Sequence, residues 1–167
     1  MKRAVVDRNV PIVANGRTDG TRDGGLPRAE CRLAAVDFLV SILRGGRVVL
    51  DLAGEIQAEY ARHLKPAGQP GVGDRFYQAV LHSAPQRVER VHLPKAADGS
   101  FVHYPSDNAL ASFDLSDRKF VALSRRAKVP VVVATDSDWV DGKAALTRNG
   151  VKIEFLCGCH REMWFDT

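Results

Sequence analysis

Carboxylate side chains gather directly after a short apolar segment, residues 131–133, which are three valines. Two of these acids, Asp136 and Asp138, are separated by a single serine. Carboxylates crowded together repel one another, and such a cluster usually persists because a cation, most often a divalent metal ion, offsets the repulsion. Hard ions such as Mg²⁺ or Mn²⁺ take oxygen ligands, polarise a phosphoryl oxygen and lower the pKa of a bound water. The pattern therefore predicts a metal site suited to phosphodiester hydrolysis.

Three more acids stand where a sheet could bring them to the same place. Asp7 closes the first expected strand, Asp117 begins the helix that precedes residues 131–133, and Glu59 lies in the helix after the strand that ends at Asp51. Ligands of an open α/β sheet gather beyond the carboxyl ends of its strands. We therefore expect a quartet of acids over one sheet edge, namely Asp7, Glu59, Asp117 and Asp136.

Each acid also has a purely structural interpretation. Asp117 can simply cap its helix, and Asp136 and Asp138 can be turn residues that begin the next one. Glu59 can be a solvated helix residue, and Glu55, one turn earlier, competes for the same role. Asp51 also ends a strand, and for it a turn role is favoured.

The elements that must position these acids alternate between strand and helix. Apolar runs predict strands at residues 3–6, 48–50, 129–134 and 151–156, with a strand or edge segment at 88–93. Helical spacing predicts helices from Pro27 to Gly45 and at residues 53–64, 76–81, 117–127 and 139–148. Strands separated by helices favour parallel βαβ units. The predicted fold class is α/β, a three-layer α/β/α sandwich with a mainly parallel central sheet.

The remaining segments read as loops. Residues 16–27 are rich in glycine and charge and predict a mobile loop, residues 65–74 predict a second loop, and residues 94–112 show no regular pattern. Residues 11–14 only continue the apolar character of the N-terminus.

Composition indicates one folded domain over residues 1–167, since the length suits a single core better than two. No apolar run approaches the ~20 residues needed to cross a bilayer, and no signal-peptide pattern opens the chain, so we expect a cytoplasmic protein. The net charge of +4 mildly favours a polyanionic partner such as nucleic acid. A basic run, residues 118–128, fits either RNA phosphates or a solvated helix face.

The three cysteines predict no disulfide, because the count is odd and the expected compartment is reducing. Cys157, Cys159 and His160 suggest zinc, but their spacing is short for a structural site, and only Cys31 or a distant histidine could complete the set of four ligands. A strand end running into a tail is the favoured interpretation.

Four motifs in order resemble the PIN-domain family of metal-dependent ribonucleases. The chain has Asp-x-Asn after its first strand at residues 7–9, a Glu-Tyr pair at 59–60, Asp-x-x-Asp-x-x-Phe at 114–120, and Thr-Asp-x-Asp after a strand at 135–138. Their order and spacing agree from residue 4 to about residue 156, and residues 65–112 match nothing in the family.

The resemblance implies a Rossmann-like fold and an endoribonuclease that cleaves single-stranded RNA with Mg²⁺ or Mn²⁺. Asp7, Glu59, Asp117 and Asp136 would then be the catalytic acids and metal ligands, with Asp138 as an auxiliary ligand. Asn9 would orient Asp7, and Arg8 stands where the family often has a small hydroxyl residue, so that a hydrogen bond near the metal is expected to be missing. Asp114 is expected only to open the helix.

The resemblance also suggests a toxin or defence nuclease restrained by an inhibitory protein partner, with no membrane partner; the oligomeric state stays open, a homodimer included. Two other functions are left open, a different acid-cluster phosphotransfer enzyme and a non-catalytic RNA- or protein-binding module. Phosphatases of the haloacid type need a second Asp where Asn9 stands, and Toprim domains normally begin with Glu.

Overall fold

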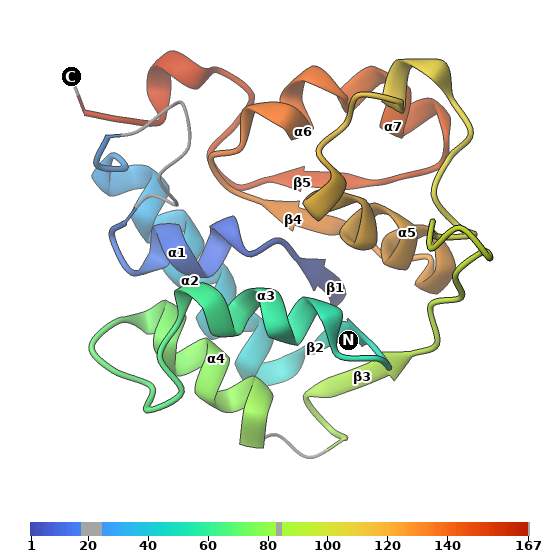
Figure 1. Ribbon diagram of the computed structural model, residues 1–167. Helices are drawn as coiled ribbons and strands as arrows, with labels where there is room; N and C mark the ends of the chain where they lie inside the picture. Colours follow the sequence, from blue (N-terminus) through green and yellow to red (C-terminus); the bar gives the residue numbers. More distant parts are fainter. Residues whose placement is uncertain (18–24, 83–84, 167) are drawn as a thin grey trace.

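A five-stranded, all-parallel sheet forms the centre of the computed structural model, which describes residues 1–17, 25–82 and 85–166 (Figure 1). The strand order is β3-β2-β1-β4-β5. The strands are β1 (Arg3–Val6), β2 (Arg47–Asp51), β3 (Val88–Val91), β4 (Val131–Val133) and β5 (Ile153–Phe155). The prediction of an α/β fold with a parallel sheet is confirmed. Most of the loop expected at residues 16–27 lies outside the described residues.

Helices flank this sheet. They are α1 (Asn9–Ala14), α2 (Ala29–Gly45), α3 (Glu55–His63), α4 (Val72–His82), α5 (Arg118–Ala127), α6 (Ser137–Asp141) and α7 (Lys143–Arg148), with short 3₁₀ turns η1 (Asn108–Leu110), η2 (Leu115–Asp117) and η3 (Arg161–Met163). Helices α1, α2 and α4 pack against one another, whereas α5 packs across β1, β2, β3 and β4. Helix α3 contacts both α4 and α5, and Figure 1 shows it beside the end of β1.

The central strands are short valine-rich segments because both of their faces are covered. Val5 and Val6 in β1 and all three valines of β4 have no exposed surface. Such near-continuous apolar runs are typical of parallel strands that helices bury on both sides. The register pairs Val5 with Val131 and Arg3 with Arg47, so β1 lies between β2 and β4.

Two segments differ from their predicted form. Residues 11–14 belong to helix α1, where Pro11 is tolerated because the first turn of a helix has no partner for its N–H. The single helix expected at 139–148 is divided at Gly142 into α6 and α7. A Cβ at Gly142 would lie 3.2 Å from the carbonyl oxygen of Asp138, so the chain packs tightly at this junction.

The prediction that the cysteines form no disulfide is wrong for one pair. Cys31 of α2 is bonded to Cys157, which follows β5. The two cysteines are 126 residues apart, and helix packing on the sheet brings them together in a way that sequence spacing cannot show. Cys157 is therefore not a thiolate ligand for zinc, and Cys159 keeps its thiol.

Among the described residues, none of the helices combines the length and the apolar character required to cross a bilayer.

Candidate metal centre

The carboxyl ends of β1 and β4 meet where the strand order reverses. The chain moves from β1 outward through β2 and β3, then returns to the other side of β1 with β4 and β5. In open α/β sheets this reversal point is the usual place for a ligand. Asp7 directly follows β1, and Asp136 follows β4 by three residues, so both belong to this crevice.

Asn9 joins the two strand ends. Its side-chain Nδ2 donates to Thr135 Oγ1 at 3.3 Å, and its Oδ1 accepts from the backbone N–H of Thr135. Its own backbone N–H donates to Asp7 Oδ2 at 3.2 Å. The contact of Asn9 with Asp7 is thus made by its backbone, whereas its side chain holds the residue next to Asp136, a role that the motif did not indicate.

An aromatic contact brings a third segment to the crevice. The rings of Phe113 and Trp139 meet edge to face with centroids 5.3 Å apart, and Trp139 is fully buried. Phe113 precedes the η2 turn, whereas Trp139 lies in α6 beside Asp138. Burying the two rings together therefore sets the acids of the η2 region against those of α6.

Three carboxylates converge there, Asp114, Asp117 and Asp138, each with one oxygen within 4.8 Å of the others. In a 3₁₀ turn, residues three apart lie one above the other, which explains why Asp114 faces the same way as Asp117. Sequence reasoning assigned Asp114 only to the helix entry. The spacing of three residues between Asp114 and Asp117 could have indicated that Asp114 also belongs to the carboxylate cluster.

The donor set suits a hard divalent ion. Two ligands on opposite sides of an ion with bonds of roughly 2.0–2.6 Å lie about 4–5 Å apart, so oxygens within 4.8 Å of one another can share one ion. All the donors are carboxylate oxygens, the ligand type of Mg²⁺, Mn²⁺ and Ca²⁺. The residues present therefore fit a divalent metal ion.

Asp117 is the most deeply buried acid of this cluster, with 1% of its surface exposed. Burial, followed by the negative charges of Asp7 and Asp136, raises the pKa of Asp117 to about 9, against the partial opposition of Arg8. It occupies the cap position of α5 but makes no capping hydrogen bond. The structure thus argues against the interpretation of Asp117 as a mere helix cap and places Asp7 and Asp136 within electrostatic reach of it.

Asp136 and Asp138 have a structural role as well. Asp136 precedes α6, and its side chain accepts a hydrogen bond from the backbone N–H of Asp138 at 3.0 Å. The turn interpretation is therefore correct for Asp136, and it fixes the direction of its carboxylate.

Glu59 is buried rather than solvated, with 6% of its surface exposed. Lys119 Nζ lies 2.9 Å from its carboxylate, Arg62 Nη1 3.3 Å and Arg8 Nε 4.0 Å. Burial raises the pKa of Glu59, but the hydrogen bond and charge of Lys119, with the charges of Arg8 and Arg62, outweigh it and lower the pKa overall. Its competitor Glu55 instead binds Lys95 at 2.6 Å.

Arg8 links Glu59 to the carboxylate cluster. Its Nη1 donates to Asp117 Oδ1 at 2.8 Å and to Ser116 Oγ at 3.3 Å, while its Nε faces Glu59. A hydrogen bond from a small hydroxyl residue was expected to be missing at this position. The charged side chain of Arg8 supplies a hydrogen bond there instead. Two of the four predicted acids, Glu59 and Asp117, thus lie beside the guanidinium of Arg8, so the site contains a cation of the chain as well as acids.

Residues around the quartet fix the helix that carries Glu59. The hydroxyl of Tyr60 donates to the carbonyl of Val6 at 2.6 Å, which ties α3 to the end of β1. The pKa of this buried tyrosine is raised well above its usual value by burial and by the charges of Asp7 and Asp51. Asp51 accepts from the N–H groups of Glu55 and Ile56, so it caps α3 as the turn interpretation predicted.

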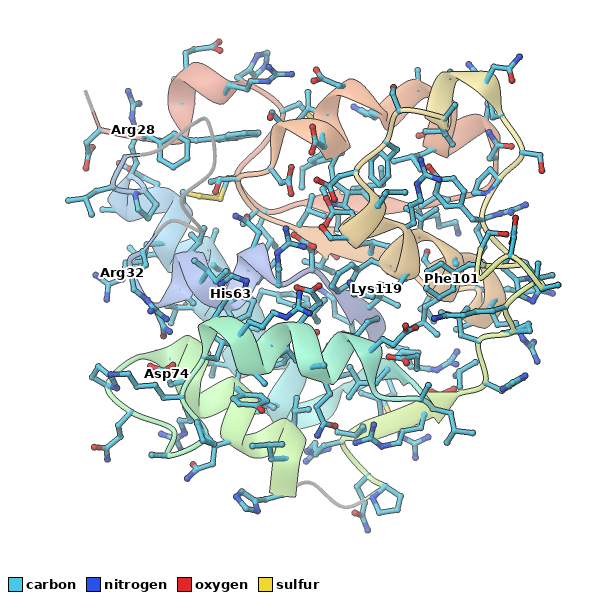
Figure 2. The ribbon with its side chains drawn as sticks, viewed as in Figure 1. Arg28, Arg32, His63, Asp74, Phe101 and Lys119 are labelled. Carbon is cyan, nitrogen blue, oxygen red and sulfur yellow. A yellow bond between two sulfur atoms is a disulfide. The ribbon has the colours of Figure 1, made fainter. Side chains whose placement is uncertain are left out.

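Most of the basic run on α5 has internal partners. Lys119 is 8% exposed and binds Glu59 and the carbonyl of Ser116 (Figure 2). Arg118 donates to the carbonyls of Ala111 and Phe113, and Arg125 to that of His103. These three cations hold neighbouring segments in place, so they are not simply a solvated helix face.

We expect Lys119→Met to lower the free energy of unfolding by about 2–3 kcal/mol, because it removes the closest cation from a buried carboxylate. Chemical denaturation at neutral pH measures the change. Arg126→Met, at an exposed position of the same helix, is the matched control and should change stability little. The double variant Glu59→Gln, Lys119→Met should recover much of the loss; an unchanged single variant would show that the pair contributes nothing.

Comparison with protein-family models, with curated proteins and with solved structures finds no match to this chain. The fold and the site define the chain as a parallel α/β protein with a carboxylate cluster that could bind a metal ion.

Proposed function

We propose that this protein is a metal-dependent endoribonuclease that hydrolyses phosphodiester bonds of single-stranded RNA. The observation that carries the proposal is the convergence of Asp114, Asp117 and Asp138 at the carboxyl edge of the sheet, beside the ends of β1 and β4. The four-motif resemblance to PIN domains supplies the reaction class and the substrate, and we extend the proposed nuclease domain over residues 1–167.

In this proposal Asp117 and Asp138 bind Mg²⁺ or Mn²⁺, together with Asp7 and Asp136. Asp114, whose carboxylate accepts from Ser116 at the entry to η2, adds a ligand on the outer side. The ion, when bound, supplies polarisation of the phosphate and a water of lowered pKa.

The other residues of the site position these groups. Glu59, the fourth acid of the quartet, anchors Lys119 and Arg8, and so keeps two positive charges beside the place where a phosphate would bind. Arg8 holds Asp117 in a fixed orientation through its 2.8 Å contact. Asn9 keeps the strand ends, and hence Asp7 and Asp136, at a constant separation.

A second candidate function is a non-catalytic RNA- or protein-binding module on the same fold. The pairing of Arg8 with Asp117 and of Lys119 with Glu59 favours it, because cations from the chain already offset part of the charge that a metal would offset. The toxin or defence role and an inhibitory protein partner are further proposals that rest on the nuclease activity.

Labelled single-stranded RNA tests the proposal. The wild type should cleave it with Mn²⁺ and not with EDTA, and the variant Asp7→Asn, Asp136→Asn should be inactive in both. Asp37→Asn, the same chemical change at an exposed position of α2, is the control and should cleave normally. Equal cleavage by the double variant, or full activity in EDTA, would contradict the metal-nuclease proposal. Absence of metal-dependent cleavage of both RNA and DNA would favour the binding module.

A further inference from the structure

The segment between β3 and η2 encloses a pocket of about 660 Å³ beside the carboxylate cluster. This volume falls within the range of roughly 300–1,000 Å³ that is typical of small-ligand sites. Its wall combines two aromatic rings, two aliphatic side chains, one cation and one acid, which are Phe101, Tyr104, Val102, Leu115, Arg118 and Asp98. Figure 2 marks Phe101 on the segment that follows β3.

The pocket shares one short stretch of chain with the carboxylate cluster. Along residues 114–118, Asp114 and Asp117 belong to the cluster, whereas Leu115 and Arg118 line the pocket. One side of the η2 region therefore faces the carboxylate cluster, and the other side faces the pocket. A chain molecule held at the carboxylates by a phosphate would have its neighbouring group at the mouth of this pocket.

Polar contacts hold the pocket in shape. Arg125 donates to the carbonyl of His103 at 2.6 Å, and the Tyr104 hydroxyl donates to the carbonyl of Leu110 at 2.7 Å. Farther along the segment, Arg148 and Asn149 both donate to the Asp107 carboxylate. A segment fixed at several points keeps its shape without a ligand, so that binding costs little ordering of the chain.

The surface of the pocket suits a flat ring attached to an anion. Leu115 and Val102 are 76% and 56% exposed, so part of the apolar wall of the pocket is uncovered. The guanidinium of Arg118 lies 4.8 Å from the centroid of the Tyr104 ring, and Lys95 Nζ lies 5.1 Å from that of Phe101. Aromatic and guanidinium planes stack on nucleobases, and these two cations, each of which lies over one ring, add positive charge that attracts phosphates.

We propose that this pocket is a subsite for one unpaired nucleobase of the nucleic acid strand whose phosphate binds at the carboxylate cluster. The proposal rests on the proposed function for the nature of the strand. It assigns a role to part of residues 65–112, the stretch that the family resemblance does not cover. It also makes single-stranded substrates the preferred ones, because a base in a duplex is stacked and cannot enter.

Fluorescence anisotropy of a labelled single-stranded RNA tests the subsite, measured with Ca²⁺ in place of Mg²⁺ or Mn²⁺ so that a cation remains at the carboxylates. Gel analysis of the same samples checks that the RNA stays intact. Phe101→Ala should raise the Kd about tenfold, the loss expected for one stacked base, and Phe101→Tyr should retain wild-type binding. Leu115→Ala, at a highly exposed position where unfolding is not expected, should also weaken binding. Leu33→Ala, an exposed leucine on α2, is the matched control and should leave the Kd unchanged.

An oligonucleotide series with one abasic position, moved along the strand, separates base binding from phosphate binding. Wild-type protein should lose about tenfold in affinity at one position of the series, and Phe101→Ala should lose no more there. Equal Kd values across the series, or equal values for Phe101→Ala and Leu33→Ala, would overturn the subsite. If RNA binding depends on the pocket but no metal-dependent cleavage occurs, the subsite is supported and the nuclease proposal is refuted. If cleavage occurs but binding does not depend on the pocket, the nuclease proposal is supported and the subsite is refuted. Binding of unstructured peptide instead of RNA would refute the nucleobase as occupant.

Discussion

The Asp117→Asn variant should lose metal binding and RNA cleavage together, with activity reduced by at least about a hundredfold. That figure is the upper end of what removing an outer-shell partner of a metal ligand costs, and we place Asp117 on the ion itself. Calorimetric titration with Mn²⁺ and initial cleavage rates measure the two effects. Asp37→Asn should change neither.

The same variant should also change how stability depends on pH in the metal-free protein. The pKa of Asp117 is about 9 in the folded chain and near 3.8 in a solvated carboxyl, so between these values the folded state holds one more proton than the unfolded state. Wild-type stability should therefore fall as pH rises across this window, by at most about 1.4 kcal/mol per pH unit. Neighbouring Asp7, Asp136, Asp114 and Arg8 moderate the slope.

The amide that replaces the Asp117 carboxyl in this variant cannot ionise, so the slope should be absent from it, and saturating Mn²⁺ should flatten the slope in the wild type. Denaturation at pH 5, 6.5 and 8 shows both effects. A wild type that gains stability between pH 5 and 8 without metal would contradict the assignment of a raised pKa to Asp117. Identical slopes in wild type and variant would do the same.

Removing the Cys31–Cys157 disulfide should lower the free energy of unfolding by about 4 kcal/mol. The bond joins residues 126 positions apart, and a closed loop of this length restricts the unfolded chain strongly. The variant Cys31→Ser, Cys157→Ser and the wild type in dithiothreitol should unfold at the same lower denaturant concentration.

Cys159→Ser provides the control for this comparison, since that cysteine keeps its thiol. It should match the oxidised wild type in stability and remain sensitive to dithiothreitol. If the reductant leaves the wild-type midpoint unchanged, the two sulfur atoms are not bonded in solution.

The alternation of strand and helix was readable because each element carries its own local pattern. The valines of β1 and β4 mark buried strands, and Gly45 marks the end of α2. The interruption at Gly142 was not readable, because an isolated glycine is tolerated within helical patterns. At this position a Cβ would lie 3.2 Å from the carbonyl oxygen of Asp138, a close contact that the local sequence does not reveal.

The candidate site was predictable to the extent that its residues follow strands or begin helices. Asp7 and Asp136 follow from strand ends, and the structure brings both within electrostatic reach of Asp117. The contacts of Lys119 and Arg8 with Glu59 could not be foreseen, because the two cations come from elements far away in sequence and the motifs that contain them specify only the acids. The disulfide was missed for the same reason.

The central position of β1 has a consequence for the order in which the molecule is made. Asn9 and its partner Thr135 are separated by 126 residues. Strand β1 is synthesised first, and its second edge can pair only after β4, one of the last strands, has been made. Chains are made from the N-terminus, and long-range pairings of this kind form late. A nascent chain that carries Asp7 but not yet Asp136 and Asp138 lacks the complete metal centre. Under the proposed function, such a chain would not cleave RNA near the ribosome until Asp136 and Asp138 have been synthesised.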